Sequence, residues 1–460
     1  MDTTATCLRK PSGETIILAI VRQLKKFRTF ESLGLRDYRF LWLGQLTTSM
    51  GQWMDQTARS WLIYDMTKSP MQLGIASAMR GAPLLIFGVV AGVVADRYGR
   101  KAQLIIAQSV NCILNLVLAT LIMTGRIQVW HIYVTGFLAG TVQAFQQPAR
   151  QVLISDLVGE SHLLNAVSLN SAALNLARSV GPAVCGLLIQ AFGVDISYFA
   201  QGAMYAFATV WTAQIRVPES SRPKRAERRS EEQGFFTSVK EGFVYIGQNR
   251  LILALMILGL APILLGMPYT SLMPIFAIDV FHGDARTQGF LLTSVGIGAI
   301  LGALIIATRG RRQGSGKLLI CGAAGFGLSL LLFSRSPVLQ VAMVFTFLAG
   351  LSNSGYTSQN QTLLQLNTPQ ELRGRVLGVY LLNRGIMPLG SLLAGALASW
   401  LGGPWAVSIM GTSCFLLVIG VAVFAPELWR LNLLQKPLAE AEGIESATSR
   451  EVRRKEEAHD

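Results

Sequence analysis

The chain has 460 residues, of which 51% are hydrophobic and only 14% carry a charge. Soluble domains have about 25% charged residues, so this composition excludes an ordinary soluble protein and indicates a chain that crosses a membrane many times. The formal net charge is +14, but the basic residues lie between apolar stretches. This favours contact with lipid headgroups and argues against nucleic acid as a partner.

Stretches of about 20 apolar residues, long enough to cross a bilayer as a helix, recur along the chain. The sequence predicts an all-α integral membrane protein with twelve spans, at 39–63, 71–95, 102–124, 128–148, 165–190, 195–215, 251–278, 287–308, 317–334, 338–360, 374–399 and 404–425. A polar, charged segment separates the sixth span from the seventh. The predicted parts are a basic N-terminal segment at 1–38, a six-helix half at 39–215, a linker at 216–250, a second six-helix half at 251–426 and a charged tail at 427–460.

The distribution of lysine and arginine predicts the orientation. The odd-numbered loops hold only Lys68, Arg126, Arg286 and Arg335, whereas the even-numbered loops, the linker and the two terminal segments hold nearly all the others. Because basic loops stay on the cytoplasmic side, both termini are expected to be cytoplasmic.

The two predicted halves resemble each other. Residues 153–188 align with residues 362–397 without gaps, and the pattern Gly88-x-x-x-Gly92 recurs as Gly298-x-x-x-Gly302. Small residues at this spacing let helices approach closely, so both copies are expected to be packing sites. Such a repeat favours a pseudo-symmetric transporter. Chance matching of glycine- and leucine-rich segments is the alternative.

A highly charged turn, ADRYGRK at 95–101, follows the second span. With its flanks it resembles the signature loop of the major facilitator superfamily of secondary transporters. The resemblance implies the twelve-helix fold of that family and a conformational latch made by Gly92, Asp96, Arg97, Gly99, Arg100 and Lys101. A cluster that only sets the orientation of the loop is the alternative. The second-half counterpart, Arg309 to Arg312, lacks the acid.

The fifth span contains Arg178-x-x-Gly181-Pro182-x-x-x-Gly186. This pattern resembles the Gly-Pro motif that exporters of the family carry in the same helix, and the resemblance implies export. Proline removes a backbone hydrogen bond and glycine permits close contact, so a packing kink without directional meaning is the alternative.

Charged residues inside the spans are the candidate substrate or coupling site, because an intramembrane charge needs a partner or a polar cavity. They are Asp55, Arg59, Arg80, Arg178 and Arg384, with the polar residues Asn175, Asn353 and Asn383. Four arginines against one deep carboxylate favour a polar or anionic substrate, and Asp55 is the residue able to relay a proton. Purely structural pairing of Asp55 with Arg59 or Arg80 is the alternative.

Many family members have an arginine in the fourth span that is tied to proton coupling. Here that span is expected to end at Pro148, with Arg150 just outside it. The resemblance therefore implies proton antiport, but the expected fourth span lacks the arginine that would support it.

Segments at 35–54, 61–74, 146–151 and 164–186 resemble the transmembrane secretion effectors, a bacterial group that includes the enterobactin exporter. The resemblance implies a monomeric exporter of the inner membrane that moves a small, siderophore-like molecule by alternating access. Its expected partners are this substrate, membrane lipids and, as a candidate coupling ion, protons. Multidrug or macrolide efflux is the nearest alternative, followed by a membrane enzyme or a non-transporting sensor.

The chemistry expected of an enzyme is missing from the sequence. The five cysteines and four histidines are dispersed, so neither a disulfide framework nor a metal site is expected, and no cofactor is implied. Paired acids and a phosphate-binding glycine loop, which would suggest a catalytic site, are not found either.

Overall fold

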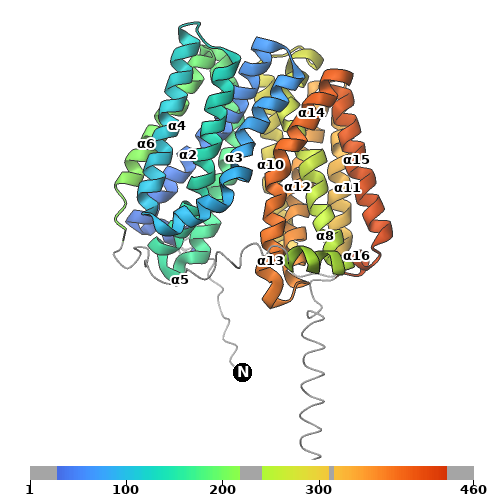
Figure 1. Cartoon of the computed structure of the whole chain (residues 1–460). Helices are drawn as coiled ribbons and strands as arrows, with labels where there is room; N and C mark the ends of the chain where they lie inside the picture. Colours follow the sequence, from blue (N-terminus) through green and yellow to red (C-terminus); the bar gives the residue numbers. More distant parts are fainter. Residues whose placement is uncertain (1–27, 218–240, 310–314, 432–460) are drawn as a thin grey trace, which may run out of the picture.

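The computed structural model describes residues 28–217, 241–309 and 315–431. Most of the expected N-terminal segment, linker and charged tail, and the Gly310–Arg312 part of the second basic turn, lie outside these residues. The described chain is helical and forms two bundles side by side, one from each half of the sequence (Figure 1).

The N-terminal bundle begins with the 3-10 helix η1 (Arg28–Gly34) and contains α2 (Arg36–Thr67), α3 (Pro70–Arg97), α4 (Arg100–Met123), α5 (Val129–Phe192) and α6 (Val194–Ala213). Glycine at position 159 has φ 67° and ψ 175°, which breaks α5 into two arms at a conformation that other residues rarely adopt. The expected fourth and fifth spans are these two arms.

The C-terminal bundle contains α8 (Arg250–Ala261), α10 (Ala285–Arg309), α11 (Ser315–Ser334), α12 (Leu339–Leu366), α13 (Gln370–Leu382), α14 (Met387–Leu401), α15 (Gly403–Phe424) and the short α16 (Glu427–Arg430). The seventh span continues from α8 through η3 (Pro262–Gly266), η4 (Met267–Leu272), α9 (Met273–Ile275) and η5 (Phe276–Val280). Proline at 262, 268 and 274 explains these irregular turns, because each removes a helical hydrogen bond. The eleventh span is likewise interrupted, by η6 (Asn383–Ile386).

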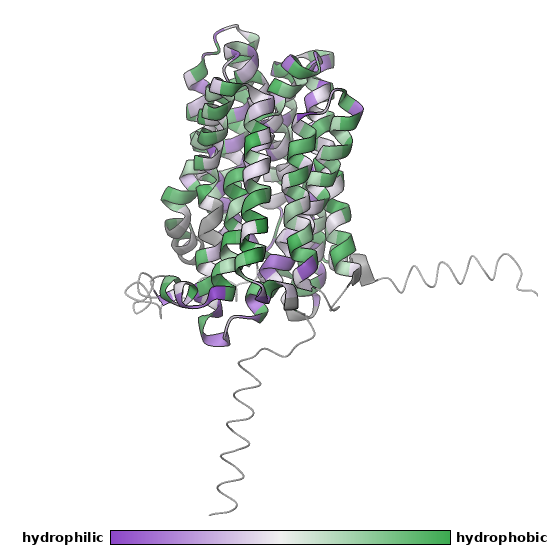
Figure 2. Ribbon diagram, turned by 90° about the vertical axis from the view of Figure 1, so that its right-hand side faces the viewer, coloured by the Kyte–Doolittle hydropathy of each residue, from purple (hydrophilic) through white to green (hydrophobic). Residues whose placement is uncertain are grey.

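The two bundles together have two ends, which we name for later use. The basic end contains the Tyr98–Gly99 turn, the Gly159 bend and the start of α8. The opposite end contains Lys68, Gly193 and Gly402. In the described chain, six helical segments are long and apolar enough to cross a membrane. The helix α2 is not among them because it carries buried polar groups such as Gln45, Asp55 and Arg59. Hydrophobic residues follow the long helices, and hydrophilic residues concentrate at the basic end (Figure 2).

Arg150 lies inside a helix, which corrects the expected end of the fourth span. The first arm of α5 runs through Pro148 and Arg150 to the bend at Gly159. The expected span stops at Pro148, but a membrane helix accommodates proline when neighbouring groups satisfy the freed backbone.

The two glycine pairs pack differently, which corrects the expectation that both bring helices together. A Cβ atom at Gly298 or Gly302 would collide with the backbone of α12, so α10 and α12 touch directly there. A Cβ at Gly92 would have no neighbour within 4 Å, and one at Gly88 would meet only Leu84 of its own helix. The repeat in the sequence therefore does not produce the same contact in both halves.

The halves are closely packed at the opposite end. A Cβ at Gly74 of α3 would lie 2.7 Å from the Ser391 carbonyl oxygen of α14, and one at Gly186 of α5 would lie 2.5 Å from the Ala285 carbonyl oxygen. Backbones approach this closely only at residues without side chains. At the basic end, the turn of α5 and helix α13 lie apart (Figure 1).

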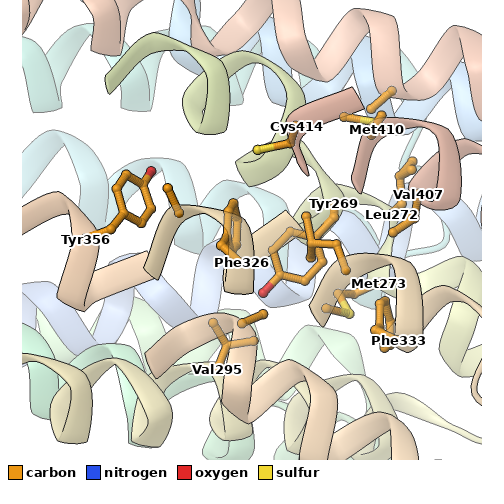
Figure 3. Packing of buried hydrophobic residues seen from close by; sticks show 14 of the residues in the cluster. Tyr269, Leu272, Met273, Val295, Phe326, Phe333, Tyr356, Val407, Met410 and Cys414 are labelled. Carbon is orange, nitrogen blue, oxygen red and sulfur yellow. The ribbon is translucent and has the colours of Figure 1, made fainter. Parts of the chain in front are cut away.

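The interiors of the halves differ in chemistry. Buried aromatic rings fill the C-terminal half, where Tyr269 meets Phe326 edge-on at 6.4 Å and Phe276 lies 4.5 Å from Phe333 between ring centroids (Figure 3). The N-terminal half instead buries polar side chains on α2, α4, α5 and α6, including Gln108, Asn111, Asn115 and Gln201. The polar interior places the candidate site in the N-terminal half.

Candidate functional site

Asp55 lies at the centre of a buried ion-pair network. The four-residue spacing on α2 places Arg59 beside it, and the Arg59 Nη2 atom donates to Asp55 Oδ1 at 2.9 Å. The Nη1 atom of Arg80, from α3, forms an ion pair with Asp55 Oδ2. The side chains of Asp55, Arg59 and Arg80 are 4%, 6% and 18% exposed. Both pairings foreseen from the sequence are therefore present together.

A third helix fixes the orientation of Arg59. Its Nη1 atom donates to the Ile132 carbonyl oxygen at 2.7 Å and to Thr135 Oγ1 at 2.9 Å, both on the first arm of α5. With a longer contact from Arg59 Nε to Asp55 Oδ2 at 3.5 Å, these donor contacts leave Arg59 little freedom to move. Arg80 is the more exposed cation of the pair and the one better placed to exchange its partner.

The network carries a net charge of +1, because one carboxylate faces two guanidinium groups. Transfer of charges into a low-dielectric interior costs several kcal/mol for each ion, and pairing offsets that cost only when the charges balance. The excess positive charge therefore favours an anionic group nearby.

A small pocket between the two halves borders this network. Arg59 and Arg80 line it from the N-terminal half. The rest of the lining consists of polar side chains and a few apolar ones: Gln56, Ser60, Ser77, Thr270 and Ser271, with Ile63, Leu73, Ala76 and Leu292. A cation among hydroxyl and amide groups can bind a carboxylate or another polar anion.

Three other predicted site residues, Arg178, Asn175 and Asn353, have contacts outside this network. The Arg178 guanidinium lies 5.5 Å from the Trp53 ring centroid. The Asn175 amide donates to the Ser171 carbonyl oxygen of its own helix, and Asn353 contacts Met267 Sδ at 3.4 Å. The side chains of Asn383 and Arg384 lie outside the described residues.

The Gly-Pro motif of the second α5 arm is a packing site. A Cβ at Gly181 would lie 2.9 Å from Trp53 Cβ on α2. The Pro182 carbonyl oxygen lies against Gly289 of α10, where a Cβ would come within 2.6 Å. The motif therefore brings α5 into contact with α2 in its own half and with α10 in the other half.

The charged turn between α3 and α4 is anchored within the N-terminal half. Arg100 pairs with Asp156 of α5. The Lys101 ammonium donates to the carbonyl oxygens of Ala213 and Ile215, both at 2.7 Å, at the end of α6. Gly99 is exposed, and the side chains of Asp96 and Arg97 lie outside the described residues.

Sequence reasoning missed two polar contacts between the halves at the opposite end. The Tyr64 hydroxyl donates to Asp279 Oδ2, and the Gln288 amide donates to Ser60 Oγ at 2.8 Å. They join α2 to η5 and α10, more than 200 positions away in the sequence. No local pattern signals such pairs; only the polarity of Asp279 beside an apolar span could have pointed to one.

Sequence comparison assigns the family. The sequence model of the family described as transmembrane secretion effector matches residues 28–445. The chain belongs to this family of major facilitator transporters. It is thus a multi-pass membrane transporter and not an enzyme, and the resemblance noted in the sequence is confirmed.

The chain is similar to transporters that are named for different substrates. It is 28% identical to the staphyloferrin A transporter of Staphylococcus aureus, over 79% of this chain and 90% of that protein. It is 26% identical to macrolide efflux protein A of Streptococcus pyogenes and to the multidrug efflux pump Tap of Mycolicibacterium fortuitum, in each case over 85% of this chain and 96% of the relative.

Solved structures support the fold. The nucleoside transporter NupG superimposes with a TM-score of 0.68 at 14% identity, covering 84% of this chain and 98% of that one. A peptide transporter of the POT family gives a TM-score of 0.68 at 13% identity, covering 86% and 95%. The all-helical major facilitator fold is therefore confirmed.

Proposed function

We propose that this transporter exports a small polar or anionic molecule, of siderophore-like chemistry, across a bacterial inner membrane. The observation that carries the proposal is the position of Arg80, which lines the pocket between the halves while sharing Asp55 with Arg59. An anionic group in the pocket would balance the excess positive charge that Asp55 leaves uncompensated.

We propose alternating access as the mechanism, and the contacts between the halves support it. With both termini cytoplasmic, the basic end faces the cytoplasm, and the described arrangement is the inward-facing state that loads cargo. Export then requires the contacts at the opposite end, such as Tyr64 with Asp279, to break. Closing the basic end would bring the residues of the charged turn, Asp96 among them, toward the second half, where they would act as the latch.

Asp55 is our candidate for coupling to a proton gradient. Export driven by an inward proton gradient requires antiport, so the proton and the cargo must occupy the site in turn. Protonation of Asp55 on the outer side, after cargo has left, would release Arg80 from its ion pair and accompany the return of the empty transporter. Loss of the proton to the cytoplasm would restore the pair, whose excess positive charge then receives the next anion. Asp55→Asn is expected to preserve cargo exchange in proteoliposomes while abolishing accumulation driven by a pH gradient. Accumulation at the wild-type rate would remove Asp55 from the coupling step.

Cargo and direction are tested together by profiling metabolites inside and outside cells with and without the gene. Export predicts that an anionic compound disappears from the medium and accumulates in cells lacking the gene. A compound that instead disappears from the cells would indicate uptake. A panel of proteoliposome flux assays that yields no substrate would favour a non-transporting sensor.

Efflux of larger drugs is the second candidate. Ile63, Leu73 and Leu292 make part of the pocket lining apolar, and an amphipathic drug would contact these residues only after the halves separate and widen the pocket, whose volume here is about 30 Å³. This function predicts that deletion lowers the inhibitory concentration of such drugs and leaves the secreted metabolites unchanged.

A further inference from the structure

Arg150 is a buried cation without a carboxylate partner among the described residues. It lies on the first arm of α5, is 6% exposed, and donates through Nη1 to the amide oxygen of Gln45 on α2. Its Nη2 atom is buried and has no hydrogen-bond partner. The ion pairs between described residues include those of Arg59, Arg80 and Arg100, but none of Arg150.

A second unpartnered group lies one helical turn away. Gln146 is 3% exposed, and both its amide nitrogen and its amide oxygen are buried without a partner. Residues four apart on a helix lie on the same face, so the Gln146 amide and the Arg150 guanidinium are neighbours. Buried donors are normally hydrogen-bonded, and an unsatisfied one costs about 1–3 kcal/mol, or more when it is charged.

Water alone would not compensate this site. A water molecule can accept from Arg150 and Gln146, but it brings no charge to balance a guanidinium inside a protein. The described polar groups that interact with Arg150 are neutral: Gln45 of α2, which donates to Ser49 at 2.7 Å, and Tyr205 of α6. Asp55 is already shared by two other arginines.

We propose that Arg150 and Gln146 bind a small anion inside the N-terminal half. Their neighbour Gln45 precedes Asp55 by ten positions on α2, which at 1.5 Å per residue separates this site from the Asp55 network by about 15 Å. The ligand chemistry is that of a chloride ion or a single carboxylate group. The near-complete burial favours the ion, because a carboxylate attached to cargo would need space for the rest of the molecule.

Thermal unfolding of the purified full-length transporter in detergent tests the site. We expect the midpoint to rise with chloride concentration, saturably, relative to gluconate at equal ionic strength, because a ligand stabilises the state it binds. Gln146→Leu removes one hydrogen bond to the anion without changing the charge and should weaken the chloride response about tenfold. Arg150→Gln should abolish it.

Arg178→Gln is the control, since it also removes an arginine from α5, a partly buried one beside the Trp53 ring, and should keep the chloride response. The same measurement with acetate distinguishes the two candidate ligands, a chloride ion and a carboxylate group. Stabilisation by acetate and not by chloride would assign the site to a carboxylate. Bromide soaked into crystals should give anomalous density beside Arg150, whatever the stability of the variants. Absence of both bromide density and stabilisation by acetate, or the same anion response in wild type and Gln146→Leu, would overturn the proposal.

Discussion

The hydroxyl of Tyr64 should help to hold the opposite end closed. It donates to Asp279 of the other half, and Tyr64→Phe removes only that hydrogen bond. A bond to a charged acceptor contributes about 1.5–3 kcal/mol. Because Asp279 is exposed, the lower value of about 1.5 kcal/mol applies. The equilibrium should then shift about tenfold toward the state open at the opposite end.

The assay is alkylation of a single cysteine at Ser77, a pocket residue between the halves. The cysteine is introduced into a protein without its native cysteines. A membrane-impermeant reagent is added on the side of the membrane that the opposite end faces. It should label the cysteine at position 77 about tenfold faster in Tyr64→Phe than in the parent protein. Tyr133→Phe is the matched control, because the buried Tyr133 hydroxyl has no hydrogen-bond partner. Equal labelling of wild type and Tyr64→Phe would refute the reasoning.

Two further predictions concern stability, measured by thermal unfolding in detergent. Gly298→Ala should destabilise the protein by about 1–3 kcal/mol, because the added Cβ collides with the backbone of α12. Gly92→Ala should leave the stability unchanged, because no atom lies within 4 Å of the added Cβ. Equal losses of stability in the two variants would contradict the packing difference. Burial alone would raise the pKa of Asp284, but hydrogen bonds from Arg286 and from the backbone N–H groups that begin α10 outweigh it and lower the pKa. Because the pKa of Asp284 is lower in the folded protein, its charged form stabilises the fold at any pH above the unfolded pKa of about 3.9. Asp284→Ala should therefore lower the free energy of unfolding by about 1 kcal/mol at neutral pH. This loss should shrink as the pH falls through the folded pKa of Asp284. An undiminished difference at pH 3 would reject that role.

Local features of the site could be predicted from the sequence. The four-residue spacing of Asp55 and Arg59 places both on one face of α2, and their depth in the membrane requires a partner. Arg80 could be assigned as that partner because α2 and α3 are joined by a short turn, which puts the two residues at similar depth. Such arguments need only helix geometry and the cost of an unpaired charge.

Long-range features could not be predicted. The expected fourth span ends at Pro148 and leaves Arg150 outside, whereas α5 continues through Arg150 to the bend at Gly159. The contact of Tyr64 with Asp279 depends on how the two halves meet, which no local pattern encodes. The different packing of the two glycine pairs also depends on neighbouring helices: a Cβ at Gly298 would meet the backbone of α12, whereas one at Gly92 has no neighbour within 4 Å.

The central claim is that cargo binds Arg80 in the pocket between the halves. Its most direct test is flux of the cargo, once identified, in proteoliposomes containing wild type, Arg80→Gln or the control Arg286→Gln, whose side chain is exposed at the opposite end. We predict that Arg80→Gln raises the KM for an anionic cargo at least tenfold, while Arg286→Gln transports as wild type. Unchanged KM and rate in Arg80→Gln, in a protein of normal stability, would contradict the account.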